Sequence, residues 1–514
     1  MFQEKTPLLD AINTFIATDP AYFRIPGHRL DRGISSRWTK RAGTAIFSYD
    51  VTETPLTDDL HAPNGAIAEA QELLSHLYGA DRSFFLVNGS TCGNEAMILG
   101  AALEGEKIMV ARNAHKSAMM GLILSGASPV YVMPELLPGW SIQGGITVRA
   151  VQECFEKNPD CKALFLVSPS YYGICSDLKA IADVCHQYGA LLLVDEAHGG
   201  HLYFHSQLPQ GALACGADVC VQSMHKVAGA LTQSSVLHIK SHGIREDALE
   251  KIAENLHLVQ STSPSYLLMT SLDCARYELA QNGEKMMEKA LTLAETTRQK
   301  IQGIHGFRCM DSADTKMTSV SELCSYDRTR LVISASELGL SGFALDSILF
   351  ENYGVNMELS DYENVLAIVT YANEEKDMDR LVNACEDISR TLLAEEEPSR
   401  EALCLSGIFP PHEAANKISE DAKGNIPAFP KFPPQIMPPR RAYFAEKREV
   451  PWQDAAGKIS GQMIAPYPPG IPVIYPGEQI SPEVWTYIER FRKDGRHMHG
   501  TDHSGRLDTI KIIT

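Results

Sequence analysis

A lysine follows an apolar segment in the middle of the chain. Lys226 closes the run Val219-Cys-Val-Gln-Ser-Met-His-Lys226. Burial at the end of such a segment disfavours the charged ammonium and lowers its pKa, which leaves a neutral amine. A neutral amine can attack a carbonyl carbon and form a Schiff base. Most lysines near strand ends are only solvated, so this hypothesis depends on what surrounds Lys226.

An aspartate closes another apolar segment, in Leu193-Val-Asp195-Glu-Ala-His198. Burying a carboxylate is unfavourable unless a positive group pairs with it. A protonated pyridine nitrogen would supply that charge, and a ring kept positive in this way acts as an electron sink. The alternative is that Asp195 caps a helix or a turn, which aspartate after a strand often does.

Two further segments could hold an aromatic phosphate ester. In Asn88-Gly89-Ser90-Thr91, glycine allows an anion to come close, and the hydroxyls and the first helical N–H groups can bind phosphate. The same residues could simply cap a helix. No Gly-Lys-Ser/Thr follows, so this is not a triphosphate-binding loop. His115, in Arg112-Asn-Ala-His115-Lys-Ser, could stack on the ring, or it could be a structural or solvated histidine.

Short apolar runs alternate with helix-like segments between about residues 80 and 240. This alternation predicts an α/β fold with a mainly parallel sheet, whose ligands bind beyond the carboxyl ends of the strands. Lys226, Asp195, Ser90 and His115 all follow predicted strands, so we expect them to surround one site. The predicted strands are Ser83–Val87, Lys107–Ala111, Pro129–Met133, Ala163–Ser168, Ala190–Asp195, Asp218–Ser223 and Ser234–Ile239, and the helices are Cys92–Leu103, Val148–Lys157 and Leu178–Tyr188.

Changes of pattern along the chain predict three regions. Residues 1–50 form an N-terminal segment, residues 51–300 a large domain that carries the site, and residues 301–514 a smaller α+β domain. In the last region we expect two strands and a helix, at Leu331–Ala335, Val365–Tyr371 and Asp377–Leu393. After Gly407 proline becomes frequent, which predicts ordered loops anchored by aromatic residues, namely Tyr443, Phe444, Trp452, Tyr467 and Tyr475.

Composition excludes several classes of protein. The formal charge is −18, which argues against a nucleic-acid-binding surface. The charge would suit a cationic substrate, although many enzymes are acidic without such a purpose. The N-terminus lacks the pattern of a signal peptide, and no run of about eighteen apolar residues predicts a membrane helix. The twelve cysteines are scattered without a metal-type doublet, so we expect reduced thiols in a cytoplasmic protein and no metal site.

Several of these segments belong to a longer set of ordered motifs. From about Phe23 to the C-terminal region, the chain resembles the bacterial ornithine, lysine and arginine decarboxylases of the aspartate-aminotransferase fold. The resemblance implies a fold-type I enzyme whose large domain binds pyridoxal 5'-phosphate. The motifs are Pro26-Gly27-His28, Asp58-Asp59-Leu60-His61, Tyr78-Gly-Ala-Asp81, Asn88-Gly-Ser-Thr91, Asp195-Glu-Ala-His198-Gly, Ser223-Met-His-Lys226, Thr232-Gln233 and Tyr467-Pro-Pro-Gly-Ile-Pro-Val-Ile-Tyr-Pro-Gly477-Glu478.

The resemblance also implies roles for individual residues. Lys226 would carry the cofactor as a Schiff base, Asp195 would face the pyridine nitrogen, and His115 would stack on the ring. His198, which we count with the catalytic residues, stands in the pocket wall where the large enterobacterial members have tryptophan. The residues implied around the phosphate are Ser90, Thr91, Ser223 and His225.

A site shared between subunits is implied as well. In this family a hydroxyl-bearing loop of the neighbouring subunit reaches the cofactor, and Ser261 and Thr262 match that loop. A homodimer would then be needed for activity. The chain begins almost directly at the family core, without the additional N-terminal domain of the larger members. We therefore expect the short form, as a dimer or a dimer of dimers.

The hypothesis for the reaction is decarboxylation of a basic amino acid. The bond between Cα and the carboxylate, held perpendicular to the conjugated ring, would break, and its electrons would enter the pyridinium beside Asp195. His225 or Lys226 would then reprotonate Cα. Arginine, giving agmatine for polyamine synthesis, is the first candidate substrate, and lysine, giving cadaverine, or ornithine is the alternative. The acidic candidates for the distal cation are Glu358, Asp50, Glu53 and Asp58, each of which could instead be a solvated surface carboxylate.

Two competing functions remain open at this point. An aminotransferase or an acyl-condensing synthase shares the fold, but it would need a firm clamp, usually an arginine, for the α-carboxylate. No arginine stands in a comparable C-terminal motif. A non-catalytic scaffold that has kept the fold is the second alternative, and the joint presence of Lys226, Asp195 and His225 argues against it.

Overall fold

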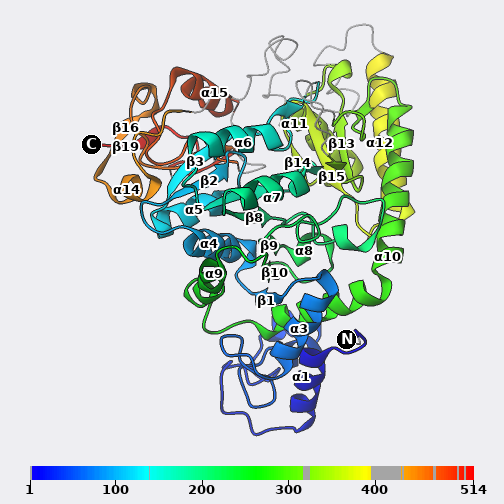
Figure 1. Cartoon of the computed structure of the whole chain (residues 1–514). Coiled ribbons are helices and arrows are strands. Elements are labelled where there is room, and N and C mark those ends of the chain that lie inside the picture. The colour runs from blue at the N-terminus through cyan, green and yellow to red at the C-terminus, as the bar shows by residue number, and fades with distance from the viewer. Residues whose placement is uncertain are drawn as a thin grey trace.

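The computed structural model describes residues 3–137, 139–315, 325–394, 430, 433–466, 471–494, 497–502 and 505–514 (Figure 1). At its centre is a seven-stranded sheet in the order β1-β10-β9-β8-β6-β2-β3. Within this sheet only β10 runs antiparallel to its neighbours. All seven predicted strands are present, as β1 (Arg82–Leu86), β2 (Lys107–Ala111), β3 (Ser128–Val132), β6 (Ala163–Val167), β8 (Leu191–Asp195), β9 (Val219–Gln222) and β10 (Ser235–Ile239).

Alternate residues of the central strands point into two separate apolar layers. Leu164 and Leu192 belong to one layer, whereas Phe165 and Leu193 belong to the other. Because both faces are covered, these strands are continuously hydrophobic. The prediction of a mainly parallel α/β fold is confirmed.

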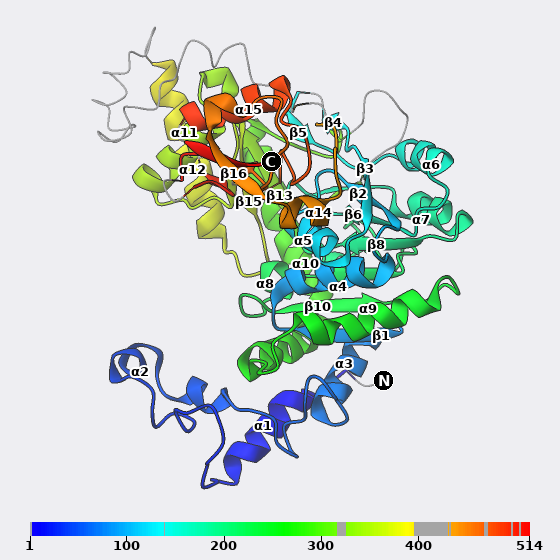
Figure 2. The ribbon, with the colours of Figure 1, turned by 90° about the vertical axis from the view of Figure 1, so that its left-hand side faces the viewer.

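The helices of the large domain divide between the two faces of the sheet. One face is covered by α4 (Gly89–Ala101), α5 (Lys116–Ser125) and α9 (Glu246–Val259), which pack against one another (Figure 2). The opposite layer contains side chains of α3 (Ala66–Tyr78), α6 (Val148–Lys157), α7 (Leu178–Gln187) and the start of α10 (Tyr266–Gln302). Helices α4, α6 and α7 correspond to the three predicted ones.

A single long helix, α10 (Tyr266–Gln302), leads from the large domain to a second sheet (Figure 1). That sheet has four antiparallel strands in the order β11-β13-β15-β14. The apolar side chains of this sheet pack in one cluster with those of α11 (Gly342–Tyr353) and α12 (Glu375–Leu393). The predicted strands and helix of this region are present as β13 (Arg330–Ser334), β15 (Asn364–Ile368) and α12; β11 (Arg308–Cys309) and β14 (Leu359–Ser360) are short additions.

The C-terminal region contains more regular structure than its prolines predict. It includes α14 (Pro439–Phe444), the pair β16 (Lys447–Pro451) and β19 (Thr509–Ile513), and α15 (Pro482–Lys493). Proline begins α15 at its first position, behind the capping hydroxyl of Ser481, where a missing N–H does no harm. The part of the predicted loops between residues 408 and 429, and the anchor Tyr467, lie outside the described residues.

The predicted aromatic anchors of this region differ in their burial. Trp452 and Tyr475 are fully buried, as an anchor must be. Tyr443 and Phe444 are 50% and 69% exposed, so their prediction as anchors is wrong for the single chain. Both lie near the end of the short helix α14, which buries Pro439 and Ala442 instead.

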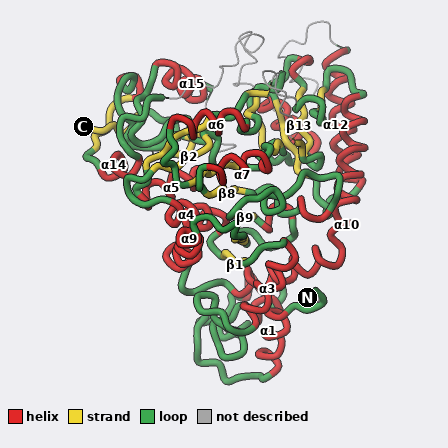
Figure 3. Tube along the Cα trace, in the orientation of Figure 1, coloured by secondary structure: helices red, strands yellow, loops and turns green. Residues whose placement is uncertain are grey.

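The N-terminal segment is mostly loop (Figure 3). Its helix α1 (Pro7–Ala17) packs against α3 and α10, and buried Arg276 of α10 binds the carbonyls of Gln3 and Lys5. The following residues form an arm that projects from the body, with α2 (Ser36–Ala42) near its end (Figure 2). The domain boundaries at residues 50 and 300 stay predictions. None of the helices described is long and apolar enough to cross a membrane.

Candidate functional site

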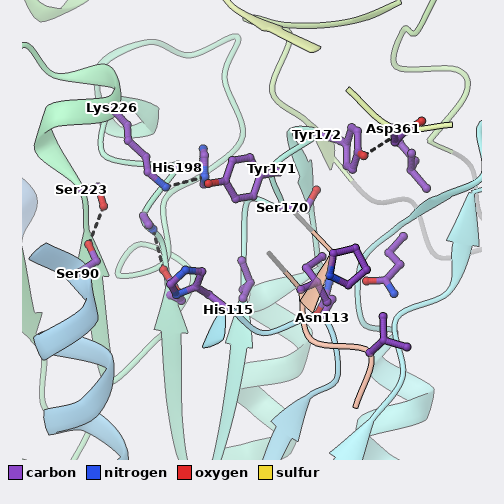
Figure 4. Close-up of a pocket in the computed structure, with 18 of the residues that line it drawn as sticks. Ser90, Asn113, His115, Ser170, Tyr171, Tyr172, His198, Ser223, Lys226 and Asp361 are labelled. Atoms are coloured by element: carbon purple, nitrogen blue, oxygen red, sulfur yellow. Dashed lines mark hydrogen bonds between the residues drawn. The ribbon is translucent and has the colours of Figure 1, made fainter. Parts of the chain in front are cut away.

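A cavity of about 560 Å³ lies at the carboxyl edge of the central sheet (Figure 4). The loops after β1, β2, β6, β8 and β9 all contribute to its wall, as the fold rule for parallel sheets requires. The second sheet and the C-terminal region close its far side through Phe343, Asp361 and Val473. The predicted residues that line it are Ser90, Thr91, His115, Asp195, His198, Ser223, His225 and Lys226.

Lys226 lies on the short helix α8 (Met224–Val227), directly after β9. Its Nζ is 2.8 Å from Nε2 of His198 and 5.0 Å from the centre of the Tyr171 ring. Burial lowers the pKa of Lys226, and this effect exceeds the opposing attraction of Asp195 and Glu358. The neutral amine that the sequence predicts is therefore favoured by the geometry of the site.

Asp195 is the last residue of β8 and is 3% exposed. Its Oδ2 accepts a hydrogen bond of 2.7 Å from Asn94, and its Oδ1 accepts one from the backbone N–H of Ala197. In the part of the chain that the structure describes, no cationic side chain lies within ion-pair distance of this carboxylate. A buried carboxylate with neutral partners retains the capacity to hold a positive ring nitrogen.

A group of hydroxyls meets the N-terminus of α4. Ser90 Oγ lies 2.8 Å from Ser223 Oγ (Figure 4). It also lies 3.2 Å from Ser235 Oγ. Gly89 begins the helix at φ +73°, a left-handed conformation that favours glycine. One turn later, a Cβ on Gly93 would lie 2.6 Å from Val221 Cγ2, so glycine lets α4 pack closely on β9. The arrangement combines helical N–H groups with hydroxyls, as an anion site requires.

His115 and His225 line the cavity from different elements, the start of α5 and α8. His115 caps α5, with Nδ1 accepting from the N–H of Ser117, and burial lowers the pKa of His115 to about 4. Nδ1 of His225 is 3.0 Å from the carbonyl oxygen of Ser234, to which it donates. Burial also lowers the pKa of His225. Both rings are therefore neutral near pH 7, and His225 keeps Nε2 as an acceptor.

The predicted acidic substrate residues do not line the cavity of the single chain. Asp58 is occupied elsewhere, because its carboxylate accepts N–H groups from residues 59, 64, 65, 67 and 68. Asp50 pairs with His28 at 3.0 Å, and Glu53 accepts a bond from the Thr52 hydroxyl. Burial raises the pKa of Glu358, whereas the nearby charges of Lys226 and Arg330 oppose this rise. Glu358 is thus the candidate placed near the reactive lysine.

Ser261 and Thr262 are exposed in the single chain and lie outside its cavity. They follow the end of α9, where the N–H of Ser261 donates to Asn88. His61 Nε2 lies 2.9 Å from the carbonyl oxygen of Ser261. Their predicted action from a neighbouring subunit stays a prediction.

Sequence reasoning missed several residues of the site. Tyr171 packs on His198 with ring centres 4.2 Å apart, and Tyr172 donates to Asp361 at 2.6 Å (Figure 4). Both tyrosines follow the apolar strand β6, so the strand-end rule that found Asp195 could have found them. Asn94 lies one turn inside α4, and Arg330 at the start of β13; neither has a local sequence signal.

Comparison with known proteins agrees with this geometry. Residues 6–377 match the model of the Orn/Lys/Arg decarboxylase major domain, and residues 425–505 match the model of the C-terminal domain of the same family. The chain belongs to the Orn/Lys/Arg decarboxylase family. Membership makes it an amino-acid decarboxylase and confirms the family and the enzyme class predicted from the motifs.

Individual relatives span the whole chain. It is 36% identical to an arginine decarboxylase of Halalkalibacterium halodurans, over 99% of this chain and 98% of the relative. It is 34% identical to an arginine decarboxylase of Bacillus subtilis, over 100% of this chain and 99% of the relative. A lysine decarboxylase of Francisella novicida has the same fold, with a TM-score of 0.86 and 22% identity, over 99% of this chain and 81% of that structure.

Proposed function

We propose that the protein decarboxylates arginine to agmatine and carbon dioxide, with pyridoxal 5'-phosphate bound at Lys226. The observation that carries the proposal is the contact of half-buried Lys226 with fully buried His198 at the carboxyl edge of the sheet, in the cavity that Asp195 also lines. The full-length relatives at 34% and 36% identity are arginine decarboxylases, which favours arginine over lysine and ornithine. A small cationic amino acid is the substrate class.

The chain's own residues fit this cofactor. Lys226 supplies the amine for the carbonyl carbon, and Asp195 a carboxylate for the ring nitrogen. Ser90 and Ser223, together with Thr91 and the first N–H groups of α4, supply donors for a phosphate. The neutral ring of His115 can lie against an aromatic ring without placing a second positive charge on it.

When bound, pyridoxal phosphate supplies a conjugated pyridinium that accepts the electron pair of the bond to the carboxylate. Asp195 would hold the positive charge at the ring nitrogen, and the burial of that carboxylate would strengthen the interaction. His198 shares a hydrogen bond with the Lys226 amine and so orients that amine in the cavity. Lys226 or His225, both of which line the cavity, returns a proton to Cα.

Recognition of the substrate's distal cation is assigned to carboxylates. Glu358 is the first candidate, because its charge acts on Lys226. Asp50 and Glu53 lie outside the cavity of one chain, so they could act only on the site of a neighbouring subunit. The geometry of Asp58 gives no support for such a role, since backbone N–H groups occupy both of its oxygens.

We place the enzyme in the cytoplasm as a homodimer or a dimer of dimers. The exposed position of Ser261 and Thr262 suits contact with a partner's site. Large apolar side chains of the N-terminal segment and of α9 are also open to solvent in the single chain, with Phe23 88%, Trp38 59% and Leu258 77% exposed. Such surfaces are typical of subunit contacts. Agmatine is a precursor of polyamines, and polyamine synthesis is the physiological role proposed.

The test is a side-by-side assay of the purified enzyme with arginine, lysine and ornithine. Carbon dioxide release and keto-acid formation are measured in the same samples. We expect release of carbon dioxide with the highest kcat/KM for arginine, and no keto acid. Keto-acid formation without release would make the protein an aminotransferase, and a preference for lysine would make it a lysine decarboxylase.

A further inference from the structure

The loop after β8 is held at two points by a segment of the second domain. This loop carries His198, which faces Lys226, and His201, and each is 2% exposed. Arg330, the first residue of β13, donates Nη2 to the carbonyl oxygen of His198 at 3.1 Å. Asp327 Oδ2 lies 3.0 Å from His201 Nε2. The position of the His198 ring therefore depends on a segment more than a hundred residues away in the chain.

The holding segment is itself closely packed. The N–H of Asp327 donates to the carbonyl of Gly173 at 2.8 Å, and Asp327 Oδ1 accepts from the N–H and the hydroxyl of Thr329. A Cβ on Gly173 would lie 2.7 Å from Arg330 Cγ, so the absence of a side chain makes room for the arginine. The guanidinium is thus brought to His198 through a close approach of two backbone segments.

Arg330 and Asp327 are both completely buried, and their charged atoms are 3.5 Å apart. Burial of such a pair carries a desolvation penalty, and apolar residues of similar volume often stabilise a fold as well or better. Burial alone would raise the pKa of Asp327, but His201 and Arg330 hold it below its usual value. The pair therefore stays charged, directly behind the loop after β8 that carries His198.

The charge of Arg330 also acts on the reactive amine. The groups whose charges act on Lys226 are the carboxylates Asp195 and Glu358 and the guanidinium of Arg330. His198 is in direct contact with the amine, and its own pKa is held well below the usual value, first by burial and then by Lys226 and Arg330. A fixed cation on this side favours the uncharged forms of both members of the pair.

We propose that Arg330 is a positioning residue that fixes His198 against Lys226 and makes the proton on their shared hydrogen bond easier to remove. It acts through the His198 carbonyl and through its charge, and Asp327 with His201 secures the same loop. The inference builds on the proposed function, because it concerns the same lysine. Arg330 does not line the cavity, so a direct role in binding the substrate is not part of it.

The test compares Arg330→Met with Arg330→Lys in the cofactor-loaded enzyme. The visible absorption of the lysine-bound cofactor is titrated with pH, and kcat and KM are measured for arginine. In Arg330→Met the apparent pKa of that band should rise by roughly one unit, because a cation that favours the neutral amine is lost. The kcat should fall more than tenfold, with a smaller change in KM. Arg330→Lys restores the charge and should return the band's pKa toward that of the wild type.

Arg276→Met is the matched control. Arg276 is also completely buried and pairs with an aspartate three residues away, but it binds the N-terminal segment. This variant should lose stability without moving the band's pKa. If Arg330→Met matches it in both the band's pKa and kcat, the inference is wrong. If Arg330→Met does not fold, Asp327→Asn is measured, and an unchanged kcat there overturns the inference. A wild type without the visible band would instead contradict the proposed function.

Discussion

At the scale of single residues, the site is built on one amine whose pKa is lowered by burial. Lys226 is half-buried, touches the neutral imidazole of His198, and lies over the Tyr171 ring. These neighbours remove solvent and add no negative charge, so the attraction of Asp195 and Glu358 is outweighed. Below the lowered pKa the amine is protonated and cannot attack a carbonyl. Activity should therefore decline as the pH falls through that value.

The first prediction at this scale is the loss of the reactive amine. Lys226→Ala should abolish the visible band of the bound cofactor and lower kcat at least about a hundredfold, because nucleophile and proton donor are lost together. Absorption spectra before and after borohydride treatment, followed by peptide mass analysis, check the assignment. Lys240→Ala, a change outside the cavity, is the control. A band that survives in Lys226→Ala would assign the cofactor to another amine.

At the scale of elements, strand ends and helix starts place the reactive groups. Glycine at position 93 allows α4 to lie close against β9, so that Ser90 at its N-terminus meets Ser223 after β9. Helix α3 is held in a different way. The carboxylate of Asp58 accepts the N–H groups of Gly65, Ile67 and Ala68, which have no partner within the helix.

The prediction at this scale concerns the carboxylate of Asp58, which caps the N-terminus of α3. Asp58→Asn keeps the shape of the side chain but turns one acceptor into a donor, so it should lower the free energy of unfolding by about 1–2 kcal/mol. Denaturant unfolding of the holoenzyme measures the change. The exposed Asp183→Asn is the control, because its ion pair with Lys179 contributes about 1 kcal/mol or less. Unchanged stability together with a raised KM for arginine would restore the substrate role predicted from the sequence.

At the scale of the whole molecule, three segments far apart in the sequence close one cavity. The second sheet contributes Asp361, and the C-terminal region contributes Val473. That region is tied to the large domain by Arg112, whose guanidinium binds the carbonyl of Val473 at 3.0 Å and Glu478 at 3.2 Å. The same guanidinium lies 4.0 Å from the centre of the Tyr475 ring. The proposed contribution of Ser261 and Thr262 would add a fourth segment, from a second subunit.

Mixed dimers test that contribution. Lys226→Ala chains are co-expressed with chains that carry Ser261→Ala and Thr262→Ala. If the hydroxyl loop acts on the partner's site, each mixed dimer has one intact site, and random pairing should restore about a quarter of the wild-type activity. Each variant alone, assayed at the same protein concentration, is the control. Activity no higher than the sum of the two controls would show that each site is complete within one chain.

The sequence by itself determined the large-domain fold and the residues at its strand ends. Apolar runs are long enough to identify buried parallel strands, and such strands bring their carboxyl ends to one edge, so Lys226, Asp195, Ser90 and His115 could be assigned to one site. Local pattern carries no information on which distant segment meets that edge. Asn94, Arg330 and Asp361 therefore have no signal in the local sequence, and the pattern does not show that backbone N–H groups surround the carboxylate of Asp58, a predicted substrate candidate. Only the tertiary structure decided the contacts of Asn94, Arg330 and Asp361, because they arise where α4 packs on the central sheet and where the second domain meets the large one.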